Sequence, residues 1–158
     1  MSDGRLHAVN VSDGGIPKTS RTSAWVDAGG VEGDRQRNLL VHGGPSRAVS
    51  LYSLDLIRAM QAEGHPIAPG TMGENLTIEG VDWSQMVPGA RLQIGELELE
   101  ITAYANPCRN IAISFADGNS ARVAHKRHPG WSRVYAKVLH EGRIAPGDSV
   151  TVAPVAPV

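Results

Sequence analysis

The sequence contains a single cysteine, Cys108, in a context that favours the anionic form of its thiol. Asn106 and Pro107 precede it, and these residue types are typical of the N-cap and the first position of a helix. Cys108 would then lie in the first helical turn, where free backbone N–H groups and the helix dipole stabilise an anion. Arg109 adds a neighbouring positive charge. Because the thiolate attacks sulfur donors and ligates metals, Cys108 is the candidate catalytic and metal-binding residue.

The competing interpretation of this cysteine is a buried and inert thiol, which is the commoner role of a free cysteine. A single cysteine excludes an internal disulfide. The six histidines form neither a His-Glu-x-x-His pattern nor a close pairing with the cysteine. A zinc or iron site made by the protein alone is therefore disfavoured.

A second motif is the segment His42-Gly43-Gly44-Pro45-Ser46-Arg47. Two glycines before a proline allow backbone angles that are closed to other residues, so the main chain can approach a ligand closely. His42 and Arg47 flank this backbone, and both suit an anionic or ring-nitrogen partner. Taken alone, such a segment is also typical of an ordinary loop.

A third motif is Gly73-Glu74-Asn75-Leu76. Asn75 carries the donors and the acceptor needed to bind a pterin or amide edge. Glu74 is a candidate general acid or base, or else a solvated charge at the end of a strand.

Basic residues follow the cysteine. Residues 119–128 look helical, and on a helix Arg122 and Lys126 share one face at i, i+4, where they would cradle a phosphate. The alternative is a solvated surface, where Lys and Arg are usually found. The candidate cofactor-binding residues are thus His42, Gly43, Gly44, Arg47, Glu74, Asn75, Arg109, Arg122 and Lys126.

Apolar and polar residues alternate along several short segments, which predicts β-strands. The clearest feature is a β-hairpin whose two alternating runs, 91–94 and 97–101, flank a tight turn. Ser53 occupies an N-cap position before an amphipathic helix that ends near Gly64. Periodicity leaves open whether residues 111–115 form a strand or a helix. Further strands are expected over residues 6–11, 23–26, 48–52, 74–80, 132–139 and 148–152.

About seven short strands with two or three small helices favour a mainly β fold, a barrel with helical inserts. The 158 residues suit one domain over residues 5–152 with a frayed tail over 153–158. The net charge of −1 gives no global field that attracts nucleic acid or a membrane surface. No apolar stretch approaches the roughly 18–20 residues that span a bilayer, and no signal peptide is visible, so we expect a cytoplasmic protein.

Taken together and in order, the motifs resemble those of the MOSC family, named for the C-terminal domain of molybdenum cofactor sulfurases. The His-Gly-Gly-Pro form is similar to that of small bacterial members related to the hydroxylaminopurine-resistance proteins. The resemblance implies a single MOSC domain, a β-barrel related to the one inserted in pyruvate kinase. It runs through Gly30–Arg35, His42–Val49, Gly73–Leu76 and Asn106–Cys108.

The resemblance also implies a role in handling sulfur or the molybdenum–pterin cofactor, with Cys108 ligating molybdenum or carrying sulfur. In the large sulfurases this domain is joined to a cysteine desulfurase that uses pyridoxal phosphate. The 158 residues leave no room for that domain, so pyridoxal phosphate is not expected here and a desulfurase or reductase partner is.

Three hypotheses follow. The preferred one is a cofactor-binding or sulfur-carrier module that acts through Cys108. The second is a molybdenum-dependent reductase of N-hydroxylated bases or amines, which needs an external electron donor because no flavin or iron–sulfur motif is present. The third is a non-catalytic interaction barrel with an inert cysteine.

Overall fold

The computed structural model describes residues 2–14, 16–34, 45–107 and 109–155. Four residues with predicted roles, Cys108, His42, Gly43 and Gly44, therefore lie outside the described residues. Within the described ranges, no helix is both long and apolar enough to cross a membrane.

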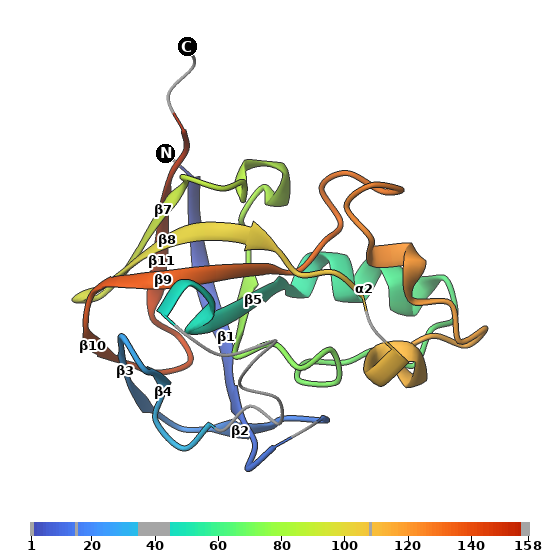
Figure 1. Cartoon of the computed structure of the whole chain (residues 1–158), viewed down its shortest axis with the longest axis horizontal. Coiled ribbons are helices and arrows are strands. Elements are labelled where there is room, and N and C mark those ends of the chain that lie inside the picture. Colours follow the sequence, from blue (N-terminus) through green and yellow to red (C-terminus); the bar gives the residue numbers. More distant parts are fainter. Residues whose placement is uncertain (1, 15, 35–44, 108, 156–158) are drawn as a thin grey trace.

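Seven strands form a closed barrel, which is completed by pairing between strands from the two ends of the chain (Figure 1). In spatial order they are β11 (Ser149–Ala153), β7 (Arg91–Ile94), β8 (Leu97–Tyr104), β9 (Val134–His140), β5 (Val49–Ser53), β6 (Leu76–Glu79) and β1 (Ser2–Val11). Strands β5 and β6 are parallel, and the other neighbouring pairs of the barrel are antiparallel. The sequence prediction of a mainly β barrel is confirmed.

Strand β1 pairs with three neighbours along its ten residues. Residues 2–5 pair with β11, residues 5–9 with β6, and residues 9–11 with the short strand β2 (Thr19–Arg21). The register shifts once within the β6 pairing, and such irregularities bend a strand and increase its twist. One strand therefore closes the barrel and also extends beyond it.

A separate sheet of three short strands lies below the barrel in Figure 1. Its strands are β10 (Gly142–Ile144), β3 (Ala24–Asp27) and β4 (Gly30–Val31). The sequence predicted the weakly alternating β3, whose Ala24 and Val26 are buried. It missed β2, β4 and β10, because two or three residues are too few to show a period.

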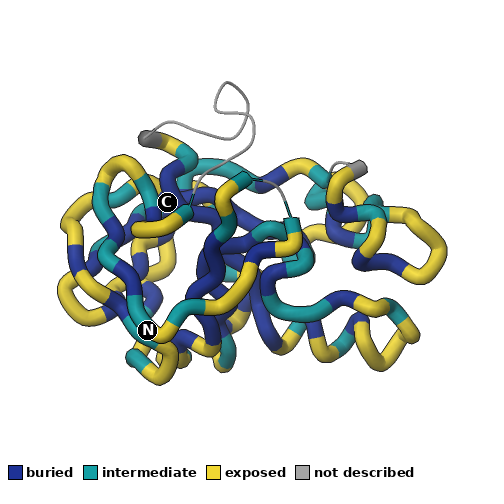
Figure 2. The backbone as a smooth tube through the Cα atoms, turned by 90° about the horizontal axis from the view of Figure 1, so that it is seen from below, coloured by how far each residue is buried: buried dark blue, intermediate teal, exposed yellow. Residues whose placement is uncertain are grey.

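The barrel interior is filled by the alternating residues of the strands. The predicted hairpin is confirmed, since Leu92, Ile94, Leu97, Leu99 and Ile101 are all buried on the inner face of β7 and β8. Figure 2 shows that buried residues run through the barrel and continue into the helical end of the molecule.

The helical end contains α2 (Leu54–Ala62) and two 3₁₀ helices, η3 (Arg109–Ser114) and η4 (Ser120–Val123), on the right of Figure 1. Helix α2 begins where the sequence predicts, because the Ser53 Oγ caps it by accepting the Leu56 N–H at 3.2 Å. The open question about residues 111–115 is answered by η3. Pro107 precedes η3 instead of occupying its first position.

The prediction of a single helix over residues 119–128 is wrong. Helix η4 has only four residues, and the chain leaves it at Ala124, whose backbone is extended. The next residue, His125, stacks on Tyr104 of β8 with ring centroids 3.7 Å apart. Packing against the barrel thus overrides the local helical propensity.

Barrel closure gives a testable prediction at Gly4, which pairs with β11. A Cβ at this position would lie 2.5 Å from the Glu79 carbonyl oxygen and 2.6 Å from Val81 Cγ2. We therefore expect Gly4→Ala to lower the free energy of unfolding by about 1–3 kcal/mol, as overpacking does. Urea denaturation measures the change, with Asp3→Ala at the exposed neighbouring position as the control. Equal stability of the two variants would contradict the steric argument.

Candidate functional site

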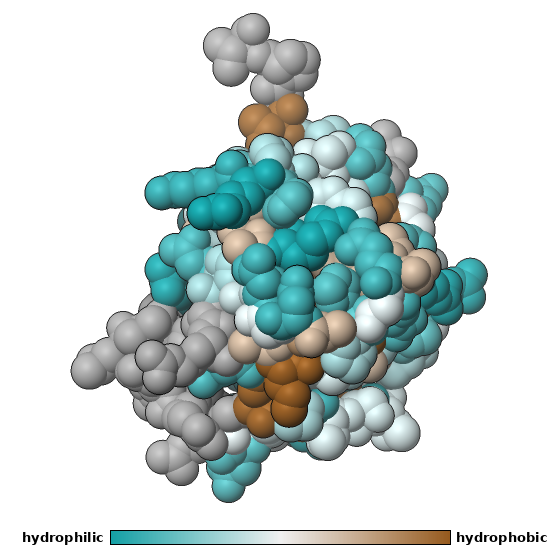
Figure 3. Space-filling model, turned by 90° about the vertical axis from the view of Figure 1, so that its right-hand side faces the viewer, coloured by the Kyte–Doolittle hydropathy of each residue, from teal (hydrophilic) through white to brown (hydrophobic). Residues whose placement is uncertain are grey.

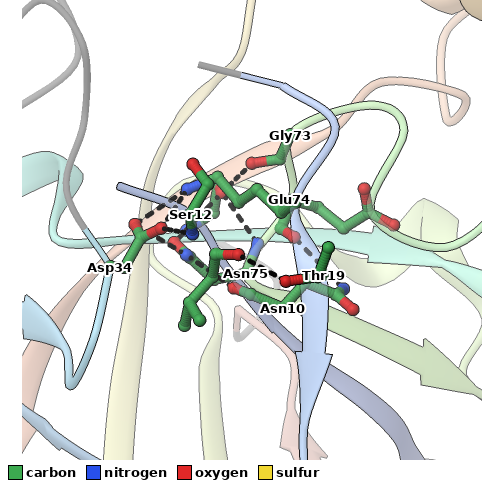
Figure 4. A network of polar contacts seen from close by, with 10 residues as sticks. Asn10, Ser12, Thr19, Asp34, Gly73, Glu74 and Asn75 are labelled. Carbon is green, nitrogen blue, oxygen red and sulfur yellow. Dashed lines mark hydrogen bonds and ion pairs between the residues drawn. The ribbon is translucent and has the colours of Figure 1, made fainter. Parts of the chain in front are cut away.

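A buried ion pair joins Lys18 and Asp34. Figure 4 shows Asp34 in a network of polar contacts with Ser12 and Asn75. The Lys18 Nζ lies 2.8 and 2.7 Å from the two carboxylate oxygens, and the side chains are only 7% and 5% exposed. Asp34 also accepts the Ser12 N–H at 3.0 Å and the Asn75 Nδ2–H at 2.9 Å. This carboxylate therefore joins the end of β1, the β4 side of the molecule and the start of β6.

Asn75 is fully buried, and its amide is already occupied within the fold. Its Oδ1 accepts the Ser50 N–H at 3.0 Å, and its Nδ2 donates to the Asn10 carbonyl at 3.2 Å as well as to Asp34. The amide thus links β1, β5 and β6. Its predicted role in reading a pterin edge stays a prediction.

Glu74 is also fully buried, which excludes the solvated strand-end charge. Its Oε2 accepts the Thr77 hydroxyl at 2.9 Å, whereas its Oε1 has no hydrogen-bond partner among the described residues. Burial raises the pKa of the Glu74 carboxyl, against smaller opposing effects of the Gly70 and Glu74 backbone N–H groups, Thr77 and Arg133. A buried carboxyl of this kind holds its proton to a higher pH than an exposed one.

Arg133 and Ser114 link residues on either side of Cys108 to the residues just before Gly73. Arg133 donates from Nη1 to the Met72 carbonyl at 2.8 Å and from Nη2 to the Asn106 carbonyl at 3.1 Å. The Ser114 hydroxyl, at the end of η3, contacts the Thr71 hydroxyl at 3.0 Å. Residues on both sides of Cys108 are therefore held against residues 71–72, immediately before Gly73-Glu74-Asn75.

Helix η3 follows Cys108 and is anchored by its apolar residues. Ile111 and Phe115 are buried, whereas Ile113 is 79% exposed. Figure 3 shows this face as mostly hydrophilic, with its largest hydrophobic area in the lower part of the view. Arg109, predicted to contact the cofactor, is the first residue of η3.

The predicted pairing of Arg122 and Lys126 on one helical face is wrong, because η4 ends at Val123. Arg122 instead forms a two-pronged ion pair with Glu63, at 3.0 and 2.8 Å, and lies 4.0 Å above the Trp131 ring centroid. Lys126 is exposed. The hydrogen bonds from Arg122 hold the pKa of Glu63 below its ordinary value.

Arg47 ends the 3₁₀ helix η1 (Pro45–Arg47), which lies against β8 and β9. The Thr102 hydroxyl of β8 donates to the Ser46 carbonyl. The Arg47 guanidinium lies 5.1 Å from the centroid of the Tyr135 ring of β9. The described end of the second motif is thus attached to the barrel wall.

Two important residues were not identified as such from the sequence. Lys18 is isolated in a polar segment, so nothing in its neighbourhood indicates a buried ion pair. Arg133 follows the other basic residues downstream of the cysteine and was not selected, although only 8% of its surface is exposed. Its place directly before the alternating strand β9 was the available signal of burial.

The chain matches known proteins over most of its length. A sequence model of the MOSC domain matches residues 38–151. The chain is 27% identical over 138 residues to the uncharacterised protein YflK of Bacillus subtilis, a match that covers 87% of this chain and 62% of YflK. The chain therefore spans less than two thirds of that relative.

Solved structures share the fold. The YuaD protein of Bacillus subtilis superposes with a TM-score of 0.79 at 18% identity, covering 98% of this chain and 97% of YuaD. YiiM of Geobacillus stearothermophilus superposes with a TM-score of 0.76 at 21% identity, covering 95% and 75%. At these identities the likeness concerns the fold alone.

The buried ion pair predicts a large effect of Lys18→Met. Removing the lysine leaves the Asp34 carboxylate buried without its compensating charge, which costs about 3–5 kcal/mol of unfolding free energy. The double variant Lys18→Met/Asp34→Leu should recover only part of this, because Ser12 and Asn75 then lose their acceptor. Urea denaturation measures both. As a control, Arg91→Met removes only exposed ion pairs and should cost about 0–1 kcal/mol.

The raised pKa of Glu74 predicts a pH-dependent effect of Glu74→Gln. Between the ordinary pKa and the raised one, the folded state binds more protons than the unfolded state, so the wild type loses stability as pH rises. The glutamine variant does not ionise, so its stability relative to wild type should increase as the pH rises above about 4, the ordinary range of a glutamate pKa. Denaturation series at several pH values test this, with exposed Glu96→Gln as control. A flat or falling difference would refute the raised pKa.

Proposed function

Because the chain belongs to the MOSC domain family, which is associated with binding of the molybdenum cofactor, we propose that it is a cofactor-binding or sulfur-carrier module acting through Cys108. The observation that supports this proposal most is the attachment of both flanks of Cys108 to residues 71–72. Asn106 and Met72, which lie more than thirty residues apart in the sequence, are thereby linked through Arg133.

The donor chemistry fits a molybdenum centre. A thiolate is a soft ligand of the kind that suits molybdenum–sulfur chemistry. Arg109, next in the chain, supplies a positive charge that favours the thiolate over the thiol. When bound, the cofactor would supply redox-active metal chemistry. The chain's own part is to hold the thiolate and to position it.

We propose a ranking of the cationic residues that would bind the phosphate of such a cofactor. Arg122 is neutralised by Glu63 and covered by Trp131 on one face, so its charge is already compensated by residues at the helical end. Arg47 belongs to the second motif and is held at the barrel wall. We therefore assign phosphate binding to Arg47 and Arg109 before Arg122 and Lys126.

Glu74 supplies a different property. Burial raises the pKa of its carboxyl, which favours the neutral acid over the carboxylate, and its Oε1 has no hydrogen-bond partner among the described residues. In the proposed site Glu74 is the candidate general acid or base.

The proposed module depends on a partner. Sulfur would come from a cysteine desulfurase, and electrons, where a reduction is involved, from a reductase. Either partner would have to reach the Cys108 segment, which lies between the end of β8 and η3 at the helical end of the molecule.

The proposal is tested by measuring molybdenum per chain after expression in a cofactor-producing host. Wild type should carry metal, and Cys108→Ser should carry at least about tenfold less, because a hydroxyl is a much weaker ligand for a soft metal centre. Glu96→Gln, at an exposed position, should match wild type. The carrier form is tested by incubation with a cysteine desulfurase and cysteine. Intact mass should then show one added sulfur on wild type and none on Cys108→Ser. Near-zero metal and no added sulfur in wild type would reject the proposal.

A further inference from the structure

Arg133 carries a buried charge that forms no ion pair among the described residues, although it lies close enough to Glu74 to oppose the rise in the pKa of that carboxyl. Only 8% of its surface is exposed, and its guanidinium forms no ion pair with a carboxylate in the described part of the chain. Its described partners are two neutral backbone carbonyls, and its Nε has none. Burying a guanidinium in this way is costly, so the residue type is explained better by geometry than by stability.

The two carbonyls belong to separate segments. The Met72 carbonyl lies two residues before Glu74, and the Asn106 carbonyl lies two residues before Cys108. In sequence these carbonyls are 61 and 27 residues away from Arg133. The planar guanidinium presents several N–H groups in fixed directions, so it can hold two acceptors at once, which a lysine ammonium does less rigidly.

The backbone that carries Arg133 is itself firmly held. The Arg133 carbonyl accepts the Ala105 N–H at 2.9 Å. The preceding carbonyls of Trp131 and Ser132 accept the Tyr52 hydroxyl at 2.7 Å and the Trp83 indole N–H at 2.8 Å. The guanidinium therefore extends from a fixed base, and its two hydrogen bonds transmit that position to both segments.

A second contact acts on the other side of Cys108. Ser114 contacts both the hydroxyl and the carbonyl of Thr71, at 3.0 and 3.3 Å. Residues 106 and 114 are thus fastened to neighbouring positions 72 and 71. Described residues before and after Cys108 are therefore attached next to Gly73-Glu74-Asn75.

We propose that Arg133 is a positioning residue, whose two hydrogen bonds join the Cys108 segment and the Glu74–Asn75 segment into one unit. The functional importance of this link rests on the proposed function, because it matters only if Cys108 acts. The two hydrogen bonds from Arg133 are themselves observed between described residues.

Hydrogen exchange measured by mass spectrometry tests the joining directly. In Arg133→Met, exchange should become at least about fivefold faster in residues 71–75 and in residues 106–114 together, because both lose the same anchor. The matched control is Leu92→Ala, a buried barrel substitution in β7, on the far side of the barrel in Figure 1. At comparable global stability it should leave these two segments close to wild type.

Arg133→Lys separates geometry from charge. A lysine keeps the positive charge but lacks the planar, forked N–H donors of arginine. The hydrogen-exchange rates of Arg133→Lys should therefore resemble those of Arg133→Met. Wild-type exchange in Arg133→Lys would show that charge alone suffices and would overturn the proposal. If Arg133→Met does not fold, Ser114→Ala removes the second contact alone, and faster exchange confined to residues 106–114 and 71–75 is again expected.

Molybdenum content links the joining to function. Arg133→Met and Arg133→Lys should retain at least about fivefold less metal than wild type, while Leu92→Ala retains a wild-type amount per folded chain. Metal-free wild type would reject the proposed function, yet the exchange results would still decide the joining. Faster exchange in only one of the two segments, or unchanged metal in the Arg133 variants of a metal-bearing protein, would overturn the positioning role.

Discussion

The buried carboxylate of Asp34 is the constraint on which the arrangement of this molecule depends. A charge that is 95% removed from water must be compensated by a cation and by hydrogen-bond donors. Here the cation is Lys18 and the donors are the Ser12 backbone and the Asn75 amide. Each of these comes from a different part of the chain, so satisfying one carboxylate fixes the end of β1 and the beginning of β6 together. Asn75 in turn fixes the position of β5, because its Oδ1 accepts the Ser50 N–H.

The same logic distinguishes two kinds of basic residue downstream of the cysteine. Arg122 meets Glu63 and stacks on Trp131 at the half-buried surface, where its charge is balanced. Arg133 is buried, and its hydrogen-bond partners within the described ranges are backbone carbonyls. The first arrangement closes the helical end over the core, whereas the second fixes the relative position of two loops. Residues that form one basic run in the sequence therefore have unrelated tasks in the fold.

The sequence predicted the regular elements well and the buried polar ones poorly. The β7–β8 hairpin and the Ser53 cap were correctly identified, because alternation and capping are local signals that need only a few adjacent residues. The helix expected over residues 119–128 was wrong, since the stacking of His125 on Tyr104 is a tertiary contact. Glu74 and Asn75 were selected for their chemistry, but their burial follows from contacts with Asn10 and Ser50, which are distant in the sequence. Nothing local marks Lys18 as the partner of Asp34.

The pairing of β1 with β11 also affects how the chain acquires its structure. The first and last strands of the barrel are neighbours, so this contact spans nearly the whole chain. Loop closure over such a separation is entropically demanding and slows folding. During synthesis, β1 must wait for β11 to emerge, with its edge open to other strands in the meantime. The start of β1 and the end of β11 lie on the same side of the barrel (Figure 1). The chain is therefore also suited to circular permutation, in which the old ends are linked and new ends are opened elsewhere.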